Sequence, residues 1–220
     1  MRDFSDQTKF FDPDSFAWDV HIIGAGGIGN MVVMLLAKMG VQKIHLWDDD
    51  NFELRNGPTE VAYSEKFVGK PKVDVAEKTI EFLVGDHCEI IKHYERVTKK
   101  TKLSGIVISG VDSMASRQVI WQAIKECFLD VALYIDARSA GEEIAIFNVL
   151  PSDFEACEIY EKDWLFDDSE ASQLACGARN IGYISTLIAS IVAANLTKFE
   201  QGEELKFFQS LDASNLHTMF

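Results

Sequence analysis

Short apolar runs separated by polar turns set the pattern of the first fifty residues. The run Val20–Ile23 is apolar except for one histidine and ends at a cluster of glycines, which predicts a buried strand feeding a turn. Residues 28–39 are apolar nearly all round and end at Gly40, as is typical of a helix packed on a sheet. The run Lys43–Trp47 predicts a second strand that stops at Asp48. These segments together predict a βαβ unit.

The remaining chain continues this alternation with less regular spacing. Pro71 is suited to the first turn of a helix, and apolar residues then recur at helical spacing up to residue 83. Strands are predicted at residues 89–91, 105–109, 132–136 and 143–150, and helices at residues 113–126 and 176–198. The acidic stretch 151–175 has little periodicity and predicts a mobile loop, and residues 205–211 predict an edge strand.

This order of elements favours the α/β fold class. It predicts a Rossmann-like, doubly wound, mainly parallel sheet flanked by helices, with added strands in the C-terminal half. No linker, repeat or low-complexity tract interrupts the pattern. A single domain is therefore predicted over residues 1–220, with its core at about residues 18–200.

Composition narrows the classes of partner. The 220 residues are 47% hydrophobic and 25% charged, and 35 acidic against 21 basic side chains give a net charge of −14. Such a surface repels phosphate backbones and anionic lipids, which argues against a nucleic-acid or membrane role. Residues 1–16 lack the apolar run of a signal peptide, and the uncharged run 180–197 is too short for a membrane helix. The four cysteines stand singly, so we expect a reducing, cytoplasmic compartment.

A glycine loop joins the first predicted strand to the first predicted helix. It contains Gly24, Gly26, Gly27 and Gly29. Glycines remove side chains where the backbone must approach a phosphate, and the N–H groups that open the next helix then point at that anion. A tight turn without a ligand is the alternative. The strand before the loop and the helix after it favour the phosphate site.

Three polar residues follow the loop at the ends of predicted elements. Asp48, the first of three consecutive acids, is placed to accept hydrogen bonds from the hydroxyls of a ribose. Lys72 stands at the start of a helix, which is unfavourable for a cation, and from there it can reach phosphates as a point charge. Asp112 follows a strand and either holds Mg²⁺ or is the N-cap of the next helix, or a residue just before that N-cap. The series favours ATP over a redox cofactor.

Longer stretches around these residues carry a resemblance to a known family. They are residues 22–29, 48–56, 68–73 and 109–113, then Arg117, and Cys176 at the start of the last predicted helix. In this order they resemble the ThiF/MoeB-type adenylyltransferases, which share a fold with ubiquitin-activating enzymes. The resemblance covers about residues 20–198. The stretch 136–138 and Cys176 look most like the compact phage and bacterial members that lack zinc.

The resemblance implies an ATP-dependent reaction on a carboxylate. The C-terminal carboxylate of a ubiquitin-like or sulfur-carrier protein, or of a peptide, attacks the α-phosphorus of ATP, giving an acyl-adenylate and pyrophosphate. Positioning and charge neutralisation carry such a reaction. The implied nucleotide-binding residues are Gly24, Gly26, Gly27, Gly29, Asp48, Asp50, Asn56 and Lys72, and the implied catalytic residues are Lys72, Arg55, Cys176 and Asp112, which also binds Mg²⁺.

Two departures from the family pattern leave alternatives open. The family has arginines where this chain has Thr59 and Asp6, and Arg55 or Arg2 is the candidate to replace their charge. Fewer cationic contacts to a triphosphate lower catalytic power, so an inactive binding module or partner subunit is the second hypothesis. An NAD-dependent oxidoreductase follows from the glycine loop and Asp48 alone and leaves the later polar residues unexplained. Cys176 either forms a covalent adduct or is inert, and a homodimer is expected with residues 180–197 near its interface.

Overall fold

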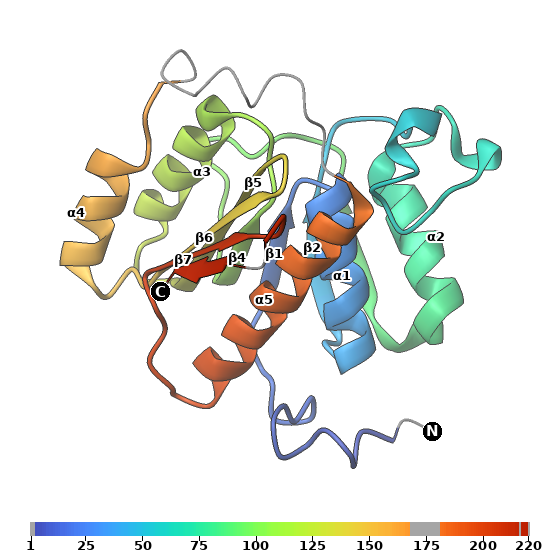
Figure 1. The fold of residues 1–220 in the computed structure, drawn as a ribbon. Coiled ribbons are helices and arrows are strands. Elements are labelled where there is room, and N and C mark those ends of the chain that lie inside the picture. The colour runs from blue at the N-terminus through green and yellow to red at the C-terminus, as the bar shows by residue number, and fades with distance from the viewer. Residues whose placement is uncertain (1–2, 168–180, 216, 220) are drawn as a thin grey trace.

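The computed structural model describes residues 3–167, 181–215 and 217–219, and its centre is one eight-stranded sheet (Figure 1). The strand order is β3-β2-β1-β4-β5-β6-β7-β8. The strands are β1 (Val20–Ile23), β2 (Lys43–Trp47), β3 (Glu89–His93), β4 (Gly105–Ser109), β5 (Val131–Ala140), β6 (Glu143–Val149), β7 (Phe208–Asp212) and β8 (His217–Met219). Strands β1 to β5 pair in parallel and β5 to β8 pair antiparallel, which confirms the mainly parallel sheet with added C-terminal strands.

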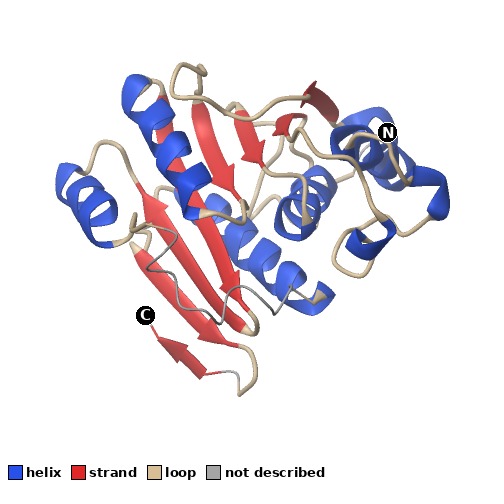
Figure 2. Ribbon diagram, turned by 90° about the horizontal axis from the view of Figure 1, so that it is seen from above, coloured by secondary structure: helices blue, strands red, loops and turns tan. Residues whose placement is uncertain are grey.

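Helices cover both faces of this sheet, as the view from above shows (Figure 2). One face carries α1 (Gly27–Met39), α2 (Lys72–Val84) and α5 (Gly182–Glu200), and the other carries α3 (Met114–Glu126) and α4 (Phe154–Asp163). The short 3-10 helices are η1 (Leu54–Asn56), η2 (Glu65–Phe67) and η3 (Gly85–His87). This layering of helices on a parallel sheet buries its central strands on both sides.

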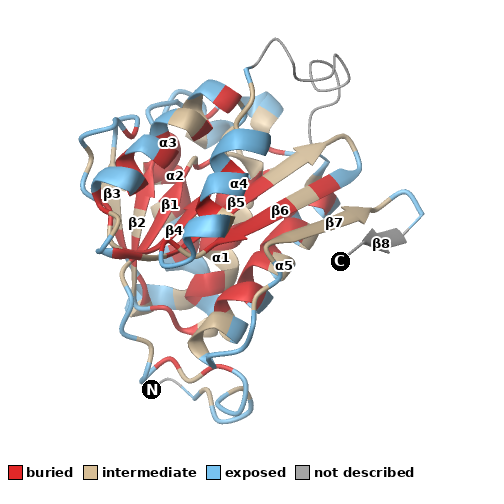
Figure 3. Cartoon of the chain, turned by 90° about the vertical axis from the view of Figure 1, so that its left-hand side faces the viewer, coloured by how far each residue is buried: buried red, intermediate tan, exposed pale blue. Residues whose placement is uncertain are grey.

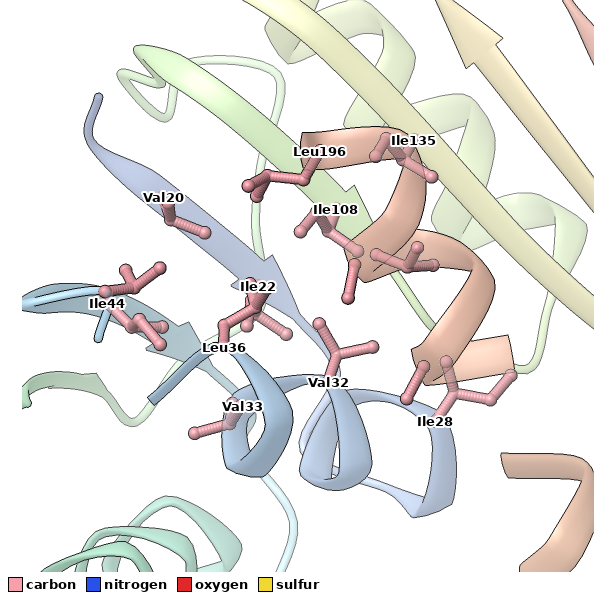
Figure 4. Packing of buried hydrophobic residues seen from close by; sticks show 14 of the residues in the cluster. Val20, Ile22, Ile28, Val32, Val33, Leu36, Ile44, Ile108, Ile135 and Leu196 are labelled. Atoms are coloured by element: carbon pink, nitrogen blue, oxygen red, sulfur yellow. The ribbon is translucent and has the colours of Figure 1, made fainter. Parts of the chain in front are cut away.

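The larger core lies between the sheet and the α1–α5 pair (Figure 4). Ile22 of β1 and Ile108 of β4 face Val32 of α1, and all three side chains are fully buried. Each such side chain contributes about 1.5–3 kcal/mol when it leaves water. Burial decreases outward along the sheet, and β7 is only half-buried (Figure 3). The central strands therefore form the rigid support for whatever binds at their ends.

Strand β1 is flanked by β2 and β4, so the order in which strands are added to the sheet reverses at β1. Helix α1 connects β1 to β2 on one side of β1, and α3 connects β4 to β5 on the other side. Ligands in open α/β sheets bind in the crevice that this reversal leaves at the carboxyl ends of the strands. The glycine loop and Asp112 stand at the ends of β1 and β4, so the fold brings them to this crevice.

The second half of the chain contains the main corrections to the sequence-based elements. The mobile loop predicted at residues 151–175 is wrong in part, because α4 forms within it behind the N-cap Asp153, whose carboxylate accepts the Ala156 N–H. Only Cys157 and Tyr160 are buried on this helix. Two buried positions leave too weak an apolar pattern for the helix to be predicted from the sequence. Strand β7 is not the edge of the sheet, since β8 pairs with it. The last helix is described from Gly182 onward, and Cys176 lies outside the described residues.

None of the helices among the described residues is long and apolar enough to cross a membrane.

Candidate functional site

The glycine loop forms an open cradle at the start of α1. Gly24 adopts φ 95°, a left-handed conformation that favours glycine. A Cβ on Gly29 would stand 1.7 Å from the Gly24 carbonyl oxygen, so the loop closes on itself there. A Cβ on Gly26 would meet no atom within 4 Å, and no side chain caps the helix that Gly26 begins. The exposed N–H groups and the positive end of the helix dipole suit a phosphate at this point.

Asp48 ties this loop to the end of β2. One carboxylate oxygen accepts the Ala25 N–H at 2.7 Å, and the other accepts the Asp50 N–H at 2.8 Å. Burial raises the pKa of Asp48, while Lys72 and the two backbone N–H groups oppose that rise. Asp48 therefore has a structural role in addition to the ribose contact predicted for it, because it fixes the loop against the strand.

Lys72 lies at the start of α2, with its side chain nearly buried. Its ammonium group donates to the Asp50 carboxylate at 3.0 Å. Burial lowers the pKa of Lys72, but the carboxylates of Asp48, Asp50 and Glu60 outweigh it and raise the pKa above its usual value. Lys72 is thus a charged group surrounded by acids, and Asp50 is its ion-pair partner.

Every other cation that lines the described part of the crevice is also paired with a carboxylate. Arg55 pairs with its neighbour Glu53, and Arg96 pairs with Asp49 at 2.9 Å. Arg117 and Arg138 share Asp136. Sequence reasoning missed Arg96, which follows β3 in a loop without any motif, and gave Arg138 no role of its own. A bound triphosphate must therefore compete with protein carboxylates for these charges.

Asn56 and Asp112 have different local roles. The Asn56 side-chain oxygen accepts the Glu53 N–H at 2.8 Å and closes the capping box of η1. Asp112 is exposed and stands two residues before the start of α3. Ser113 is the N-cap of that helix, and its hydroxyl accepts the Ser116 N–H at 3.2 Å. Asp112 is therefore not the N-cap but the residue just before it, which is one of the two positions that the capping alternative allowed. Mg²⁺ binding by Asp112 stays a prediction.

The run Asp48, Asp49 and Asp50 is a cluster of carboxylates whose oxygens lie within 4.8 Å of one another. Each acid already has protein partners: backbone N–H groups for Asp48, Arg96 for Asp49 and Lys72 for Asp50. These contacts explain why three acids follow β2, where a ribose needs one. The cluster supports the loop and neutralises the cations around it.

Glu60 is the buried group that sequence reasoning did not single out. It is 5% exposed, and neither carboxylate oxygen has a hydrogen-bond partner among the described residues. Burial raises its pKa from an ordinary 4.5 to about 7, with Lys72 opposing the rise and Asp48 adding to it. The sequence around Gly57 and Pro58 is typical of a surface turn, so nothing in the pattern indicated a buried acid.

The predicted residues converge on one large cavity of about 1840 Å³. Its lining includes Gly24, Gly26, Gly27, Asp48, Asp50, Arg55, Asn56, Lys72 and Asp112. Among the predicted residues that the structure describes, Gly29 is the exception, because it packs beneath Gly24 and does not line the cavity. The cavity continues along the sheet to an aromatic end formed by Phe147, Trp164 and Phe208. Its volume exceeds the usual range of about 300–1,000 Å³ for a single small ligand, which leaves room for a second substrate.

Known proteins share both the sequence pattern and the fold. The ThiF family matches residues 14–219. A probable molybdopterin-synthase adenylyltransferase from Gracilaria tenuistipitata var. liui is 27% identical in an alignment of 207 residues, and the match covers 81% of this chain and 57% of that protein. The catalytic subunit of the NEDD8-activating enzyme E1 from Saccharomyces cerevisiae is 24% identical in an alignment of 183 residues, and the match covers 76% of this chain and 60% of that subunit.

Among solved structures, Escherichia coli MccB with ATP has a TM-score of 0.70 and 20% identity, and the match covers 92% of this chain and 62% of MccB. The MccB complex with N-formylated MccA has a TM-score of 0.71 and 21% identity, over 92% of this chain and 63% of that chain. At this identity the likeness shows the fold. The chain thus spans about six tenths of the length of these similar proteins.

Proposed function

The chain belongs to the ThiF family, and from this we propose that it is an ATP-dependent adenylyltransferase. It activates the C-terminal carboxylate of a ubiquitin-like or sulfur-carrier protein, or of a peptide, by forming an acyl-adenylate and releasing pyrophosphate. The similar proteins include adenylyltransferases and a subunit of a NEDD8-activating enzyme, and one structural neighbour was solved with a peptide, MccA. Residues 1–220 act in this proposal as one nucleotide-binding domain.

The size and continuity of the cavity carry the proposal. Its glycine end has an open helix N-terminus, an acid at the end of β2 and a nearly buried lysine. These groups fit a nucleoside triphosphate, because the backbone N–H groups and Lys72 meet phosphates and Asp48 meets ribose hydroxyls. The aromatic end stands further along the same cavity and accommodates the carboxylate substrate. A redox enzyme would not need a lysine among the phosphates.

The chain's own residues supply position and charge. The Gly24–Gly29 loop fixes the phosphates, and Lys72 stabilises charge that develops at the transferred group. Asp112, exposed beside the cavity, is the proposed ligand of Mg²⁺, which would neutralise phosphate charge when bound. The ionised carboxylate of the substrate is already a nucleophile, so no general base is required.

The test is ATP–pyrophosphate exchange with Mg²⁺ and a panel of carrier proteins and peptides. Exchange is expected with one member of the panel, and Lys72→Met should lower it roughly 100-fold. The matched control is Lys70→Met, because Lys70 is exposed and lies over the Phe67 ring at 5.5 Å, away from the cavity. Equal losses in the two variants would contradict the role of Lys72.

An inactive binding module remains the second candidate, favoured by the paired cations and by Thr59. A Cβ on Gly27 would stand 3.0 Å from the Thr59 Cβ, so residue 59 borders the phosphate cradle. An arginine there would add an unpaired charge where the triphosphate lies. ATP binding without exchange in the wild type, together with exchange in Thr59→Arg, would establish this candidate.

Two further parts of the proposal concern assembly and compartment. We propose a homodimer in which α5 lies near the interface, since its outward positions Tyr183, Thr186, Ser190 and Ala194 are exposed and uncharged. Light scattering after size exclusion measures this directly, and a monomer at all concentrations would contradict it. We also propose a cytoplasmic location, which fits single, buried cysteines such as Cys88, Cys127 and Cys157.

A further inference from the structure

A buried carboxylate lies beneath the cavity, between its two ends. Asp136 is on β5 and is completely buried. One of its oxygens accepts the Ser109 hydroxyl at 2.9 Å and Arg117 Nε at 3.0 Å. The other accepts Arg138 Nε at 2.6 Å and the Tyr160 hydroxyl at 2.8 Å. The single charge of Asp136 therefore holds two guanidinium groups, one on each oxygen.

The arginine on the first oxygen leads to the nucleotide end. Arg117 belongs to α3, and its other nitrogens donate to the Val111 carbonyl at 2.6 Å and to the Ser113 carbonyl at 3.2 Å. These carbonyls belong to the residues on either side of Asp112. The backbone that presents Asp112 to the cavity is thus held from beneath by Arg117, and Arg117 is held in turn by Asp136.

The arginine on the second oxygen leads to the aromatic end. Arg138 Nη1 donates to the Trp164 carbonyl at 3.0 Å, at the residue that ends α4. Its guanidinium lies over the Phe147 ring, with the central carbon 4.5 Å from the ring centroid. Phe147 and Trp164 line the aromatic end of the cavity, and their rings are 4.7 Å apart between centroids. Arg138 therefore fixes the wall of that end against the same carboxylate.

We propose that Asp136 is a positioning residue that holds the Asp112 loop and the end of α4 in one fixed arrangement. The two arginines cannot reorient independently, because each competes for the charge of one buried carboxylate and takes one of its oxygens. A disturbance at Arg138 is expected to reach the Asp112 loop, although the hydrogen bonds of Arg138 among the described residues go to Asp136, Trp164 and Tyr160 and not to that loop. The consequence for catalysis rests on the proposed function; the mechanical coupling does not.

Amide hydrogen exchange tests the coupling without any substrate. The readout is the segment 110–117, in which the Gly110 amide donates to Ile23 and the amides of Ser116 and Arg117 donate to Ser113. In Arg138→Met, exchange in this segment should become at least about fivefold faster, while α2 exchanges at its wild-type rate. The control variant is Lys125→Met, which breaks an exposed α3–α4 ion pair with Glu161.

A milder variant protects this test against a folding defect. Tyr160→Phe keeps the ring among its neighbours and removes one hydrogen bond to Asp136, so its effect should be in the same direction and smaller. Unchanged amide exchange at residues 110–117 in both variants would overturn the proposal, because Asp136 would then bind the Asp112 loop and the end of α4 independently.

A kinetic readout follows where pyrophosphate exchange is measurable. Arg138→Met should raise the Mg²⁺ concentration for half-maximal rate of pyrophosphate exchange about fivefold. A fall in kcat alone, with unchanged Mg²⁺ dependence, would contradict the positioning of Asp112. If the wild type shows no pyrophosphate exchange with any substrate, the proposed function is refuted. The amide hydrogen exchange measurement then still decides whether Asp136 couples the two segments.

Discussion

Replacing Glu60 by glutamine should make the protein more stable above neutral pH. The pKa of Glu60 is raised from 4.5 to about 7 by burial, so the folded state holds a proton that the unfolded state has already released. The sign follows directly: stability is highest below pH 4.5 and is lost as pH rises towards 7. Each pKa unit corresponds to about 1.4 kcal/mol, and the shift therefore amounts to about 3 kcal/mol at pH 8.

Urea denaturation followed by tryptophan fluorescence measures the free energy of unfolding at pH 5 and pH 8. On going from pH 5 to pH 8, the wild type should lose about 2–3 kcal/mol more free energy of unfolding than Glu60→Gln loses. The comparison uses the change with pH, because a buried amide has its own unsatisfied groups at either pH. The control is Glu65→Gln, at an exposed acid in η2, which should follow the wild type.

The reasoning would be refuted if Glu60→Gln and the wild type lost stability in parallel. Glu60 would then be paired or hydrated in solution. An increase in the stability of the variant that is the same at both pH values would point to packing and not to ionisation.

Three other predictions concern the sheet and the glycine loop. Burial lowers the pKa of His21 to about 4, with His45 adding to the effect, so the unfolded state takes up the proton first. Stability present above pH 6.5 should therefore fall by about 2 kcal/mol at pH 5, and His21→Gln should lose less in the same urea titration. Gly29→Ala should cost more than about 3 kcal/mol, because its Cβ would collide with the Gly24 carbonyl. Gly26→Ala should keep the wild-type Tm, since its Cβ meets no atom, and weaken ATP binding about tenfold in calorimetry. Wild-type affinity in Gly26→Ala would place the phosphates elsewhere.

The parts of the site that sequence reasoning anticipated are those that local rules determine. The glycine loop, Asp48 and Lys72 each stand at a boundary between elements, where strand ends and helix starts have fixed meanings. Their meeting at one crevice followed from the parallel order of the strands. The same rules located the helix before Gly40, which adopts φ 102° as its left-handed cap.

The parts it missed depend on contacts between distant segments. The pairing of Lys72 with Asp50 had no signal in the sequence, because it depends on the loop after β2 folding back on α2. Arg96 and Asp49 come from different strand ends, 47 residues apart. Asp136 could be placed on a strand from its neighbours, but its two arginine partners became evident only from the packing of α3 and α4. Burial of Glu60 likewise depends on tertiary packing that no local pattern reports.

The position of α5 in the chain has a consequence for biosynthesis. This helix and α1 together cover Ile22, Ile108 and Ile135, yet α5 begins at Gly182, after every parallel strand has been made. A nascent chain that has emerged only up to α4 exposes that half of the sheet face to its surroundings. Such surfaces bind chaperones or other unfinished chains. Slow translation before α5 is therefore expected to be the point at which newly made protein is most readily lost to aggregation.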